Sequence, residues 1–314
     1  MKRRNFIKYL GAGTVLVGGG VTPLPLWANT RRSVKLTILH TNDVHSRIEP
    51  FASGRNAGKG GAARRAAVID KIRREEEHVL LFDAGDIFQG TPYFNLYGGE
   101  LEFKLMSQMK YDAATIGNHD FDAGIEGLEK QMPHADFPFV ISNYDFSDTV
   151  LAGRTEPYKV LRRGPLKVGV FGLGIELNGL VPRVLYRETR YLDPVEKAQQ
   201  MVTQLRREEQ CDYVICLSHL GYQYREQTIS DVRLGQAVSG IDLILGGHTH
   251  TFLDTPTVVK NPDDEPVLIN QAGWGGIVLG RLDVFFERSG KNTCVHCENL
   301  LVGSTSLKVA QNTG

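Results

Sequence analysis

The 314-residue sequence has little cysteine, no surplus of charge and no long hydrophobic run. Four cysteines are too few for the dense disulfide framework of a small secreted domain. Lys and Arg balance Asp and Glu at 36 each, so the totals give no sign of a nucleic acid polymer or an anionic membrane as partner. The apolar stretch at residues 9–21 is too short to cross a bilayer as a helix. A globular chain is the class that remains.

Glycine-rich nucleotide-binding motifs are also missing, although the chain contains 34 glycines. Residues 54–60 lack the Gly-x-x-x-x-Gly-Lys-Ser/Thr spacing of a phosphate-binding loop. Residues 172–177 contain two glycines but not the third glycine of a dinucleotide fingerprint. Both segments are therefore interpreted as ordinary loops.

The cysteines fall into two pairs. Cys211 and Cys216 flank an apolar, strand-like run, which indicates buried thiols. Cys294 and Cys297 have the spacing of half a zinc site, but no second pair exists to complete four ligands. Positions three apart in a regular strand also face opposite sides. A disulfide between Cys294 and Cys297 stays open as the alternative.

The N-terminus has the pattern of an export signal. Residues 1–8 are basic, and a glycine-rich apolar stretch with a small residue before Asn29 follows, which predicts a signal over residues 1–28. Arg3 and Arg4 resemble a twin-arginine signal, with an ordinary signal as the alternative. The signal contains no cysteine, so a lipidated N-terminus is not expected. We expect localisation in the periplasm or cell envelope of a bacterium.

The remaining residues, 29–314, are expected to form one domain without a membrane span. Removing four basic residues with the signal leaves 32 basic and 36 acidic residues, a net charge of −4. Apolar runs and helical patterns alternate along this part, which predicts an α/β fold with parallel pairing, and the late strands suggest a second, more antiparallel sheet. Strands are expected at 34–40, 79–82, 113–116, 139–142, 166–173, 213–218, 241–245, 267–270 and 277–286, and helices at 61–77, 100–109, 124–132, 194–209 and 231–238.

Polar side chains follow many of these expected strands. In open α/β sheets, ligands bind at the carboxyl ends of the strands, so these side chains are expected to converge in one cleft. They are Asp43 and His45, Asp86, Asn118 and His119, His219, and His248 and His250.

Several of these residues have the spacing of metal ligands. Asp43 and His45, like His248 and His250, are two positions apart, so each pair can point the same way in extended chain. Carboxylate and imidazole groups are common ligands of divalent metals. Asp86 can offer one oxygen to each of two ions. Taken singly, each motif also fits a solvated loop.

Together, these motifs resemble the calcineurin-like metallophosphoesterases, and more closely the catalytic domain of the 5′-nucleotidase family. The segments that carry the resemblance are ILHTNDVHSRIEP, DAGDIFQGTP, GNHDFD and GGHTH, and the resemblance spans roughly residues 34–286. It implies a four-layer α/β/β/α sandwich with two mixed sheets and a metal site at the carboxyl ends of the strands. It also implies two divalent metal ions, of Mn, Zn, Fe, Co or Mg.

The resemblance implies a role for each polar residue. His119 would stabilise the transition state or act as acid, with Asp122 orienting it, and Asp120 stays unassigned. Asn118 and His119 would contact the substrate phosphate. His40, His78, His134 and His296 are interpreted as structural. The implied metal ligands are Asp43, His45 and His250 for the first ion, Asp86 as the bridge, and Asn118, His219 and His248 for the second ion.

The implied activity is hydrolysis of phosphate esters, most of all nucleotides, by a metal-activated hydroxide. The substrates would be those of a 5′-nucleotidase, a UDP-sugar hydrolase or a 2′,3′-cyclic phosphodiesterase. A thiosulfohydrolase of the same fold is the alternative. Full-length 5′-nucleotidases have a second, substrate-binding domain, and the match stops about where it would start. Broad specificity, a separate polypeptide that carries this domain, and a truncated chain are the three possibilities left open.

Overall fold

The computed structural model describes residues 33–287 and 292–303. The expected export signal at residues 1–28 lies outside this range. None of the helices in the described part is long and apolar enough to span a bilayer.

Two mixed sheets form the centre of the domain. The first has the order β13-β12-β1-β2-β3, in which β1, β2 and β3 are parallel and β12 and β13 are antiparallel to their neighbours. Its strands are β1 (Val34–Thr41), β2 (Val79–Asp83), β3 (Ala113–Ala114), β12 (Val278–Phe286) and β13 (Asn292–Leu301).

The second sheet has the order β10-β11-β9-β8-β6-β5, with β11, β9, β8 and β6 parallel and an antiparallel strand at each edge. Its strands are β5 (Tyr158–Arg163), β6 (Leu166–Leu173), β8 (Tyr213–Ser218), β9 (Leu243–Gly246), β10 (Thr257–Lys260) and β11 (Pro266–Gln271). A separate two-stranded ribbon pairs β4 (Tyr144–Asp145) with β7 (Arg190–Tyr191).

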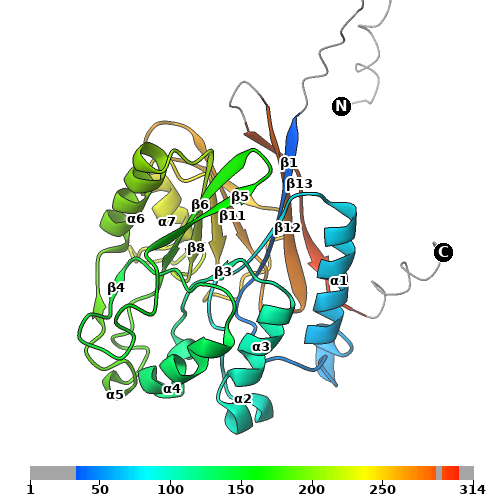
Figure 1. The fold of residues 1–314 in the computed structure, drawn as a ribbon, viewed down its shortest axis with the longest axis vertical. Coiled ribbons are helices and arrows are strands. Elements are labelled where there is room, and N and C mark those ends of the chain that lie inside the picture. Colours follow the sequence, from blue (N-terminus) through cyan, green and yellow to red (C-terminus); the bar gives the residue numbers. More distant parts are fainter. Residues whose placement is uncertain (1–32, 288–291, 304–314) are drawn as a thin grey trace, which may run out of the picture. The chain divides into compact units, whose positions relative to one another are not determined.

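Helices cover the outer faces of both sheets (Figure 1). One apolar cluster joins the first sheet to its helices, a second fills the space between the sheets, and a third joins the second sheet to its helices. The predicted α/β/β/α sandwich is therefore confirmed. The helices are α1 (Ala62–Glu75), α2 (Pro92–Tyr97), α3 (Glu100–Gln108) and α4 (Gly124–Gln131) beside the first sheet, a short α5 (Arg183–Tyr186), and α6 (Pro194–Thr203) and α7 (Asp231–Ala237) beside the second.

Strand β1 shows why its sequence is apolar on both faces. Leu36 and Ile38 pack between the two sheets, whereas Leu39 packs against the helices of the first sheet. A strand covered on both faces loses the polar alternation that a half-exposed strand would have. Full burial of one such side chain contributes about 1.5–3 kcal/mol.

Helix starts follow the expected local chemistry. The side chains of Thr91, Asp193 and Ser230 accept hydrogen bonds from the first turns of α2, α6 and α7. Such caps satisfy backbone N–H groups that have no partner inside the helix. Helix α6 continues as a π-helical turn at Gln204–Glu208, so the predicted helix at 194–209 has a change of helix type near its end.

Two predictions about the strands are wrong. The late strands form no sheet of their own: β12 and β13 extend the first sheet beside β1, and β10 and β11 extend the second beside β9. The expected strand at 139–142 makes only isolated bridges, which pair Phe139 with Ala114 and Val140 with Glu156. Both errors arise because pairing between distant segments decides sheet membership.

The cysteines behave differently in the two pairs. Cys211 and Cys216 are buried free thiols, as predicted. Cys297 is disulfide-bonded, and the side chain of Cys294 lies outside the described residues. A β-bulge in β13 places positions 294 and 297 opposite Val284 and Leu282, two residues apart on β12. The bulge therefore overturns the expectation that these two positions face opposite sides.

Candidate metal centre

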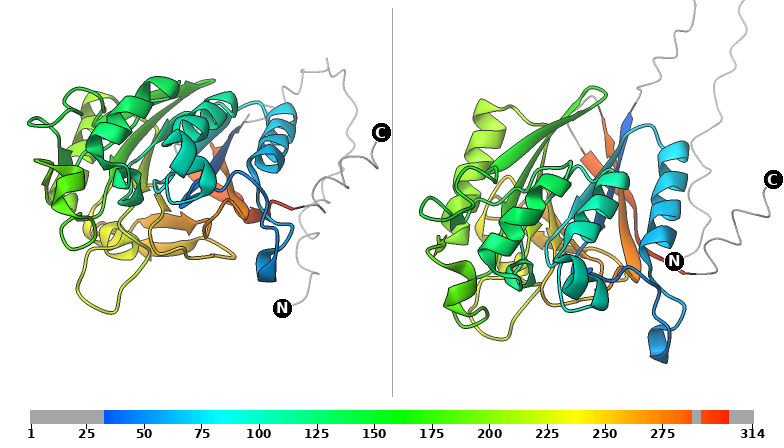
Figure 2. Two further views of the ribbon diagram at one scale, coloured as in Figure 1. Left: turned by 90° about the horizontal axis from the view of Figure 1, so that it is seen from below. Right: turned by 60° about the horizontal axis from the view of Figure 1, so that its bottom comes forward.

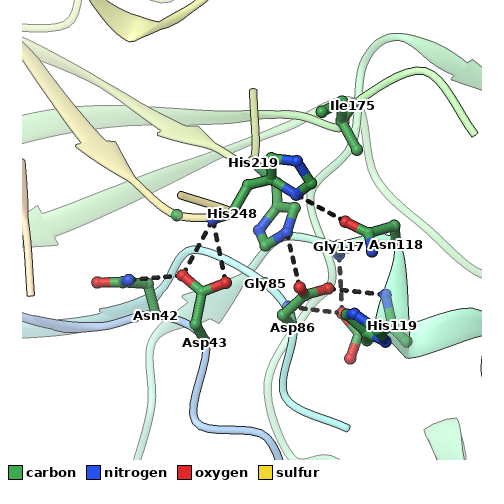
Figure 3. Close-up of polar contacts among 12 residues, drawn as sticks. Asn42, Asp43, Gly85, Asp86, Gly117, Asn118, His119, Ile175, His219 and His248 are labelled. Atoms are coloured by element: carbon green, nitrogen blue, oxygen red, sulfur yellow. Dashed lines mark hydrogen bonds and ion pairs between the residues drawn. The ribbon is translucent and has the colours of Figure 1, made fainter. Parts of the chain in front are cut away.

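The polar residues predicted at the strand ends come together at one edge of the domain. Strands β1, β2 and β3 are parallel in the first sheet, and β8 and β9 are parallel in the second. The loops that follow these strands gather at one end of the domain in the further views (Figure 2). Figure 3 shows the side chains they carry, with Asp43, Asp86, Asn118, His219 and His248 around a common space.

A first group consists of Asp43, His45 and His250. The Nε2 atoms of His45 and His250 lie 2.9 Å apart, and Asp43 Oδ1 lies 3.8 Å from the first and 3.4 Å from the second. Two imidazole nitrogens and a carboxylate oxygen that converge on one point suit a divalent ion. His45 is held by its other ring nitrogen, which lies 3.1 Å from the Phe88 carbonyl oxygen.

A second group consists of Asp86, His219 and His248. His219 Nε2 lies 3.1 Å from Asp86 Oδ2, and its Nδ1 lies 2.7 Å from the Ala84 carbonyl oxygen. His248 Nδ1 lies 2.9 Å from the amide oxygen of Asn118. Asp86 Oδ2 is also 4.0 Å from His45, so this carboxylate lies between the two groups. The ligand atoms of each group lie within 4.8 Å of one another, which suits one divalent ion in each group.

Backbone strain is concentrated at these residues. Five of the candidate ligands have a left-handed backbone, with φ of 49° at Asp43, 50° at His45, 56° at Asp86, 69° at His248 and 53° at His250. Such a conformation costs a non-glycine residue on the order of 1–3 kcal/mol and is found mostly at functional sites. The fold therefore holds these side chains in place at the expense of stability.

Two glycines allow the loops to approach each other closely. Gly85 has φ of 88°, and a Cβ atom at Gly117 would lie 2.2 Å from Asp86 Oδ1. A larger residue at position 117 would displace the carboxylate that lies between the groups. The Gly-Asp and Gly-Asn-His segments are thus a steric requirement of this centre.

Charges in the centre call for a cation. Burial alone would raise the pKa of Asp86, but the neighbouring imidazole of His219 holds it below its ordinary value. Asp86 in turn raises the pKa of His219 to about 10, against the effect of burial. A buried carboxylate needs a positive partner, which can be a protonated histidine or a metal ion. The residues present therefore fit a bound divalent cation.

His119 stands at the edge of the centre and belongs to neither group. Its Nδ1 lies 3.2 Å from the carboxylate of Asp122, and both side chains are 33% exposed. This hydrogen bond raises the pKa of His119, although burial opposes it. The amide of Gln89 lies 3.3 Å from the same ring. A partly exposed histidine at this edge can exchange protons with solvent or with a small molecule.

Sequence reasoning missed Asn42 and Gln89, which support the centre, and left Asp120 unassigned. Asp120 is buried and accepts backbone hydrogen bonds from the Asp86 loop. The side-chain amide of Asn42 donates to Asp43 at 2.6 Å. Asn42 and Gln89 lie within the segments that carried the family resemblance, which was the one signal for them. Their side-chain directions could not be read from the sequence.

Of the histidines interpreted as structural, His40, His78 and His134 belong to neither group. His40 is fully buried and bonds to the Asn270 amide at 2.9 Å. His134 lies 3.9 Å from Glu100 on the surface, and the ring of His78 packs beside Gly164. The side chain of His296 lies outside the described residues.

Comparisons with known proteins agree with this geometry. A family model described as calcineurin-like phosphoesterase matches residues 36–252. The snake venom 5′-nucleotidase of Crotalus adamanteus is 37% identical over 281 residues, which cover 82% of this chain and 46% of that protein. The chain therefore spans about half the length of the curated relatives it matches.

Solved structures lead to the same family. The 5′-nucleotidase precursor from Thermus thermophilus has a TM-score of 0.76 at 34% identity, covering 89% of this chain and 59% of that one. The sulfate thiohydrolase SoxB of the same genus has a TM-score of 0.72 and covers 88% of this chain and 60% of that one. At 18% identity, that likeness shows a common fold alone. With these matches and its two metal-suited groups, the chain belongs to the calcineurin-like phosphoesterase family.

Proposed function

We propose that this chain is a two-metal phosphoric ester hydrolase that acts on nucleotides. The supporting observation is the position of Asp86 between the two metal-suited groups, with His119 beside it. The Asp86 carboxylate lies 4.0 Å from His45 and 3.1 Å from His219, and it accepts the backbone N–H of His119 at 2.8 Å. Two adjacent cation sites with a protonatable side chain at their edge suit in-line hydrolysis of a phosphate ester.

The ligand roles follow from this arrangement. When bound, two divalent ions polarise a phosphoryl group and make a water a better nucleophile near neutral pH. Carboxylate, amide and imidazole donors suit Mn, Zn, Fe, Co or Mg and do not select among them. We assign Asp43, His45 and His250 to the first ion, Asn118, His219 and His248 to the second, and Asp86 to both.

His119 and Asp122 are proposed as the catalytic pair. Because its hydrogen bond to Asp122 favours the charged form, we propose that protonated His119 stabilises negative charge on the phosphate or donates its proton to the leaving oxygen. Asp122 keeps the ring oriented. Asn118 is proposed to contact the phosphate as well, since a neutral amide adds no negative charge beside an anionic substrate. No serine or cysteine nucleophile is required.

The substrate class rests on the relatives. Proteins named 5′-nucleotidase from Crotalus adamanteus and Thermus thermophilus match most of this chain. We therefore propose a nucleotide or a related ester, as for a 5′-nucleotidase, a UDP-sugar hydrolase or a 2′,3′-cyclic phosphodiesterase. These relatives extend well beyond the matched part. We propose that some contacts to the nucleoside come from outside the matched part. A separate polypeptide is one source of such contacts.

A substrate panel tests this function. The purified protein is assayed with AMP, UDP-glucose, 2′,3′-cyclic AMP and an aryl phosphate, with Mn²⁺, Zn²⁺, Co²⁺ or Mg²⁺ or without metal, while elemental analysis measures bound metal in the same sample. We expect metal-dependent release of phosphate or nucleoside. No turnover of any ester with any metal rejects the proposal. Activity on a thiosulfonate-bearing carrier, with none on phosphate esters, would instead establish the thiosulfohydrolase alternative.

Export to the cell envelope of a bacterium is proposed for the protein's location. The basic and apolar pattern of residues 1–28 supports it. The disulfide at Cys297 is also typical of an oxidising compartment. Fusion of residues 1–28 to a folded reporter tests the proposal. Export that is lost on changing Arg3 and Arg4 to lysine supports the twin-arginine route, and a reporter that stays inside the cell rejects both.

A further inference from the structure

The indole of Trp274 stacks on the imidazole of His250. The two ring centroids lie 5.8 Å apart and the rings are inclined by 16°. Aromatic rings at such distances attract each other beyond the area they bury. The side chain of His250 is 42% exposed, and its other ring contact is edge to face with His45, at a centroid distance of 5.0 Å.

His250 differs from His219 and His45 in how its ring is held. His219 bonds through its other ring nitrogen to the Ala84 carbonyl oxygen, and His45 to that of Phe88. Within the described part of the chain, no residue hydrogen-bonds the Nδ1 atom of His250. Metal-binding histidines usually need a partner that fixes the ring orientation. The face of the Trp274 indole, which stacks on the His250 ring, can replace that partner.

Trp274 is itself fixed from behind. The ring of Phe51 meets the indole edge to face, with centroids 5.3 Å apart and an interplanar angle of 80°. The guanidinium of Arg47 lies 4.4 Å from the centroid of the Phe51 ring on its face. A row of contacting groups therefore extends from Arg47 through Phe51 and Trp274 to His250.

The backbone on both sides of Trp274 is tied to the loop that carries Asp43. The Gly275 N–H donates to the Asp43 carbonyl oxygen at 2.7 Å, and the Asn42 side chain donates to the Gly273 carbonyl oxygen at 2.7 Å. Gly273 and Gly275 have φ of 69° and 63°, which lets the chain turn sharply on each side of the indole. These bonds fix the position of Trp274 relative to Asp43.

We propose that Trp274 is a positioning residue for the first metal, because its indole holds the exposed His250 ring toward Asp43 and His45. The inference rests on the proposed two-metal function. It predicts that loss of the aromatic face weakens the first ion and leaves the second ion unchanged. The second group has a support of its own, since His219 is fully buried and its ring bonds to the Ala84 carbonyl oxygen.

Tryptophan emission gives a readout that does not depend on activity. The chain has two tryptophans, and Trp27→Phe leaves Trp274 as the sole one. Mn²⁺ is titrated into the metal-free full chain carrying Trp27→Phe, and we expect the emission to follow one of two binding events. Emission that follows neither event, in a protein that binds two ions by calorimetry, would overturn the proposal.

Variants then test the aromatic face. Trp274→Leu is expected to weaken one of two Mn²⁺ sites about 2- to 10-fold, the range that aromatic stacking energies correspond to. Trp274→Phe keeps a ring face and is expected to restore most of that affinity. Tyr97→Leu, which removes a 52% exposed aromatic side chain on α2, is the control and should bind both ions normally.

The outcomes separate this inference from the proposed function. If the wild type binds two ions and Trp274→Leu changes neither affinity, the positioning role is disproved and the proposed function stands. Equal losses of Mn²⁺ affinity in Trp274→Phe and Trp274→Leu, or in Tyr97→Leu, also disprove the positioning role. Far-UV circular dichroism checks that each variant is folded. A wild-type protein that binds no divalent ion removes the proposed function itself, and this inference with it.

Discussion

The carboxylate of Asp120 accepts a hydrogen bond from the backbone N–H of Asp86 at 3.1 Å. The same carboxylate accepts the N–H groups of Ile87 at 2.9 Å, Phe88 at 3.1 Å and Gly117 at 2.8 Å. In return, the Asp86 carboxylate accepts the N–H of His119. Each loop thus holds the other through its acidic side chain. The unassigned residue of the Gly-Asn-His-Asp segment therefore has a position between the loops that carry Asp86 and His119.

Asp120→Asn should loosen this connection. Asparagine has a single acceptor oxygen, and its amide would face buried N–H donors, so at least one donor loses its partner at a cost of about 1–3 kcal/mol. We expect a comparable fall in the free energy of unfolding, measured by urea denaturation of the metal-free protein, together with weaker metal binding. Asp122→Asn is the control, because its side chain is partly exposed, and it should change stability by less than about 0.5 kcal/mol. Equal free energies of unfolding for the two variants would argue against a role of Asp120 in connecting the two loops.

Asp86 and His119 should fail in different ways when they are replaced. Asp86→Ala removes the carboxylate between the two groups and is expected to lose bound metal by elemental analysis. His119→Asn should keep its metal and lose about 10²- to 10⁴-fold in kcat, as expected for a positioned acid. Metal loss in the His119 variant would refute the proposed division between ligand and acid.

Asp122→Asn should move the pH dependence of the reaction. The hydrogen bond that His119 donates to the Asp122 carboxylate is the largest cause of the raised pKa of His119, so the wild type keeps this proton to a higher pH than an ordinary histidine. Without that carboxylate the pKa falls, and the alkaline limb of kcat should shift to lower pH. The measurement is a kcat profile from about pH 5 to pH 10 for both proteins. If the alkaline limb of the kcat profile does not shift, it reports the titration of a group other than His119.

His40 should make the protein sensitive to acid. Burial lowers the pKa of His40 to about 3, so between pH 6.5 and 3 the unfolded chain binds a proton that the folded protein does not. The neutral ring therefore contributes stability above its ordinary pKa that is lost as pH falls. His40→Gln can still accept the Asn270 amide, and relative to it the wild type should lose about 2 kcal/mol between pH 7 and pH 5. Urea denaturation at the two pH values measures the free energy of unfolding of both proteins. Equal losses of this free energy in the wild type and in His40→Gln would contradict the prediction.

Metal removal should destabilise the folded state. Ions that bind only the folded protein stabilise it by about 2.7 kcal/mol at a concentration 100 times Kd. We expect treatment with EDTA to lower Tm and added Mn²⁺ to restore it, as followed by calorimetry. His119→Asn should show the same response. Asp86→Ala should show little of it, and a full response there would place the shared ligand elsewhere.

Much of the architecture could be read from local patterns. The central strands β6 and β8 were predicted with their observed bounds, because apolar β-branched runs between polar turns are a strong signal. The edge strand β5 was missed, since its residues are mostly half-buried and several of them are charged. Strand β10 was missed for a similar reason, because only one face of an edge strand is covered.

The sequence by itself determined which residues could serve as metal ligands, because aspartate, asparagine and histidine follow parallel strands. It also indicated which motifs belong together, through their order along the chain. Only the tertiary structure decided that His45 meets His250 across 205 positions, that Trp274 stacks on His250, and that Asp120 holds the Asp86 loop. The physical reason is the distance along the chain over which each kind of interaction acts. Backbone periodicity is a local property, whereas these contacts depend on which distant strands pair and on left-handed turns that only the assembled fold can stabilise.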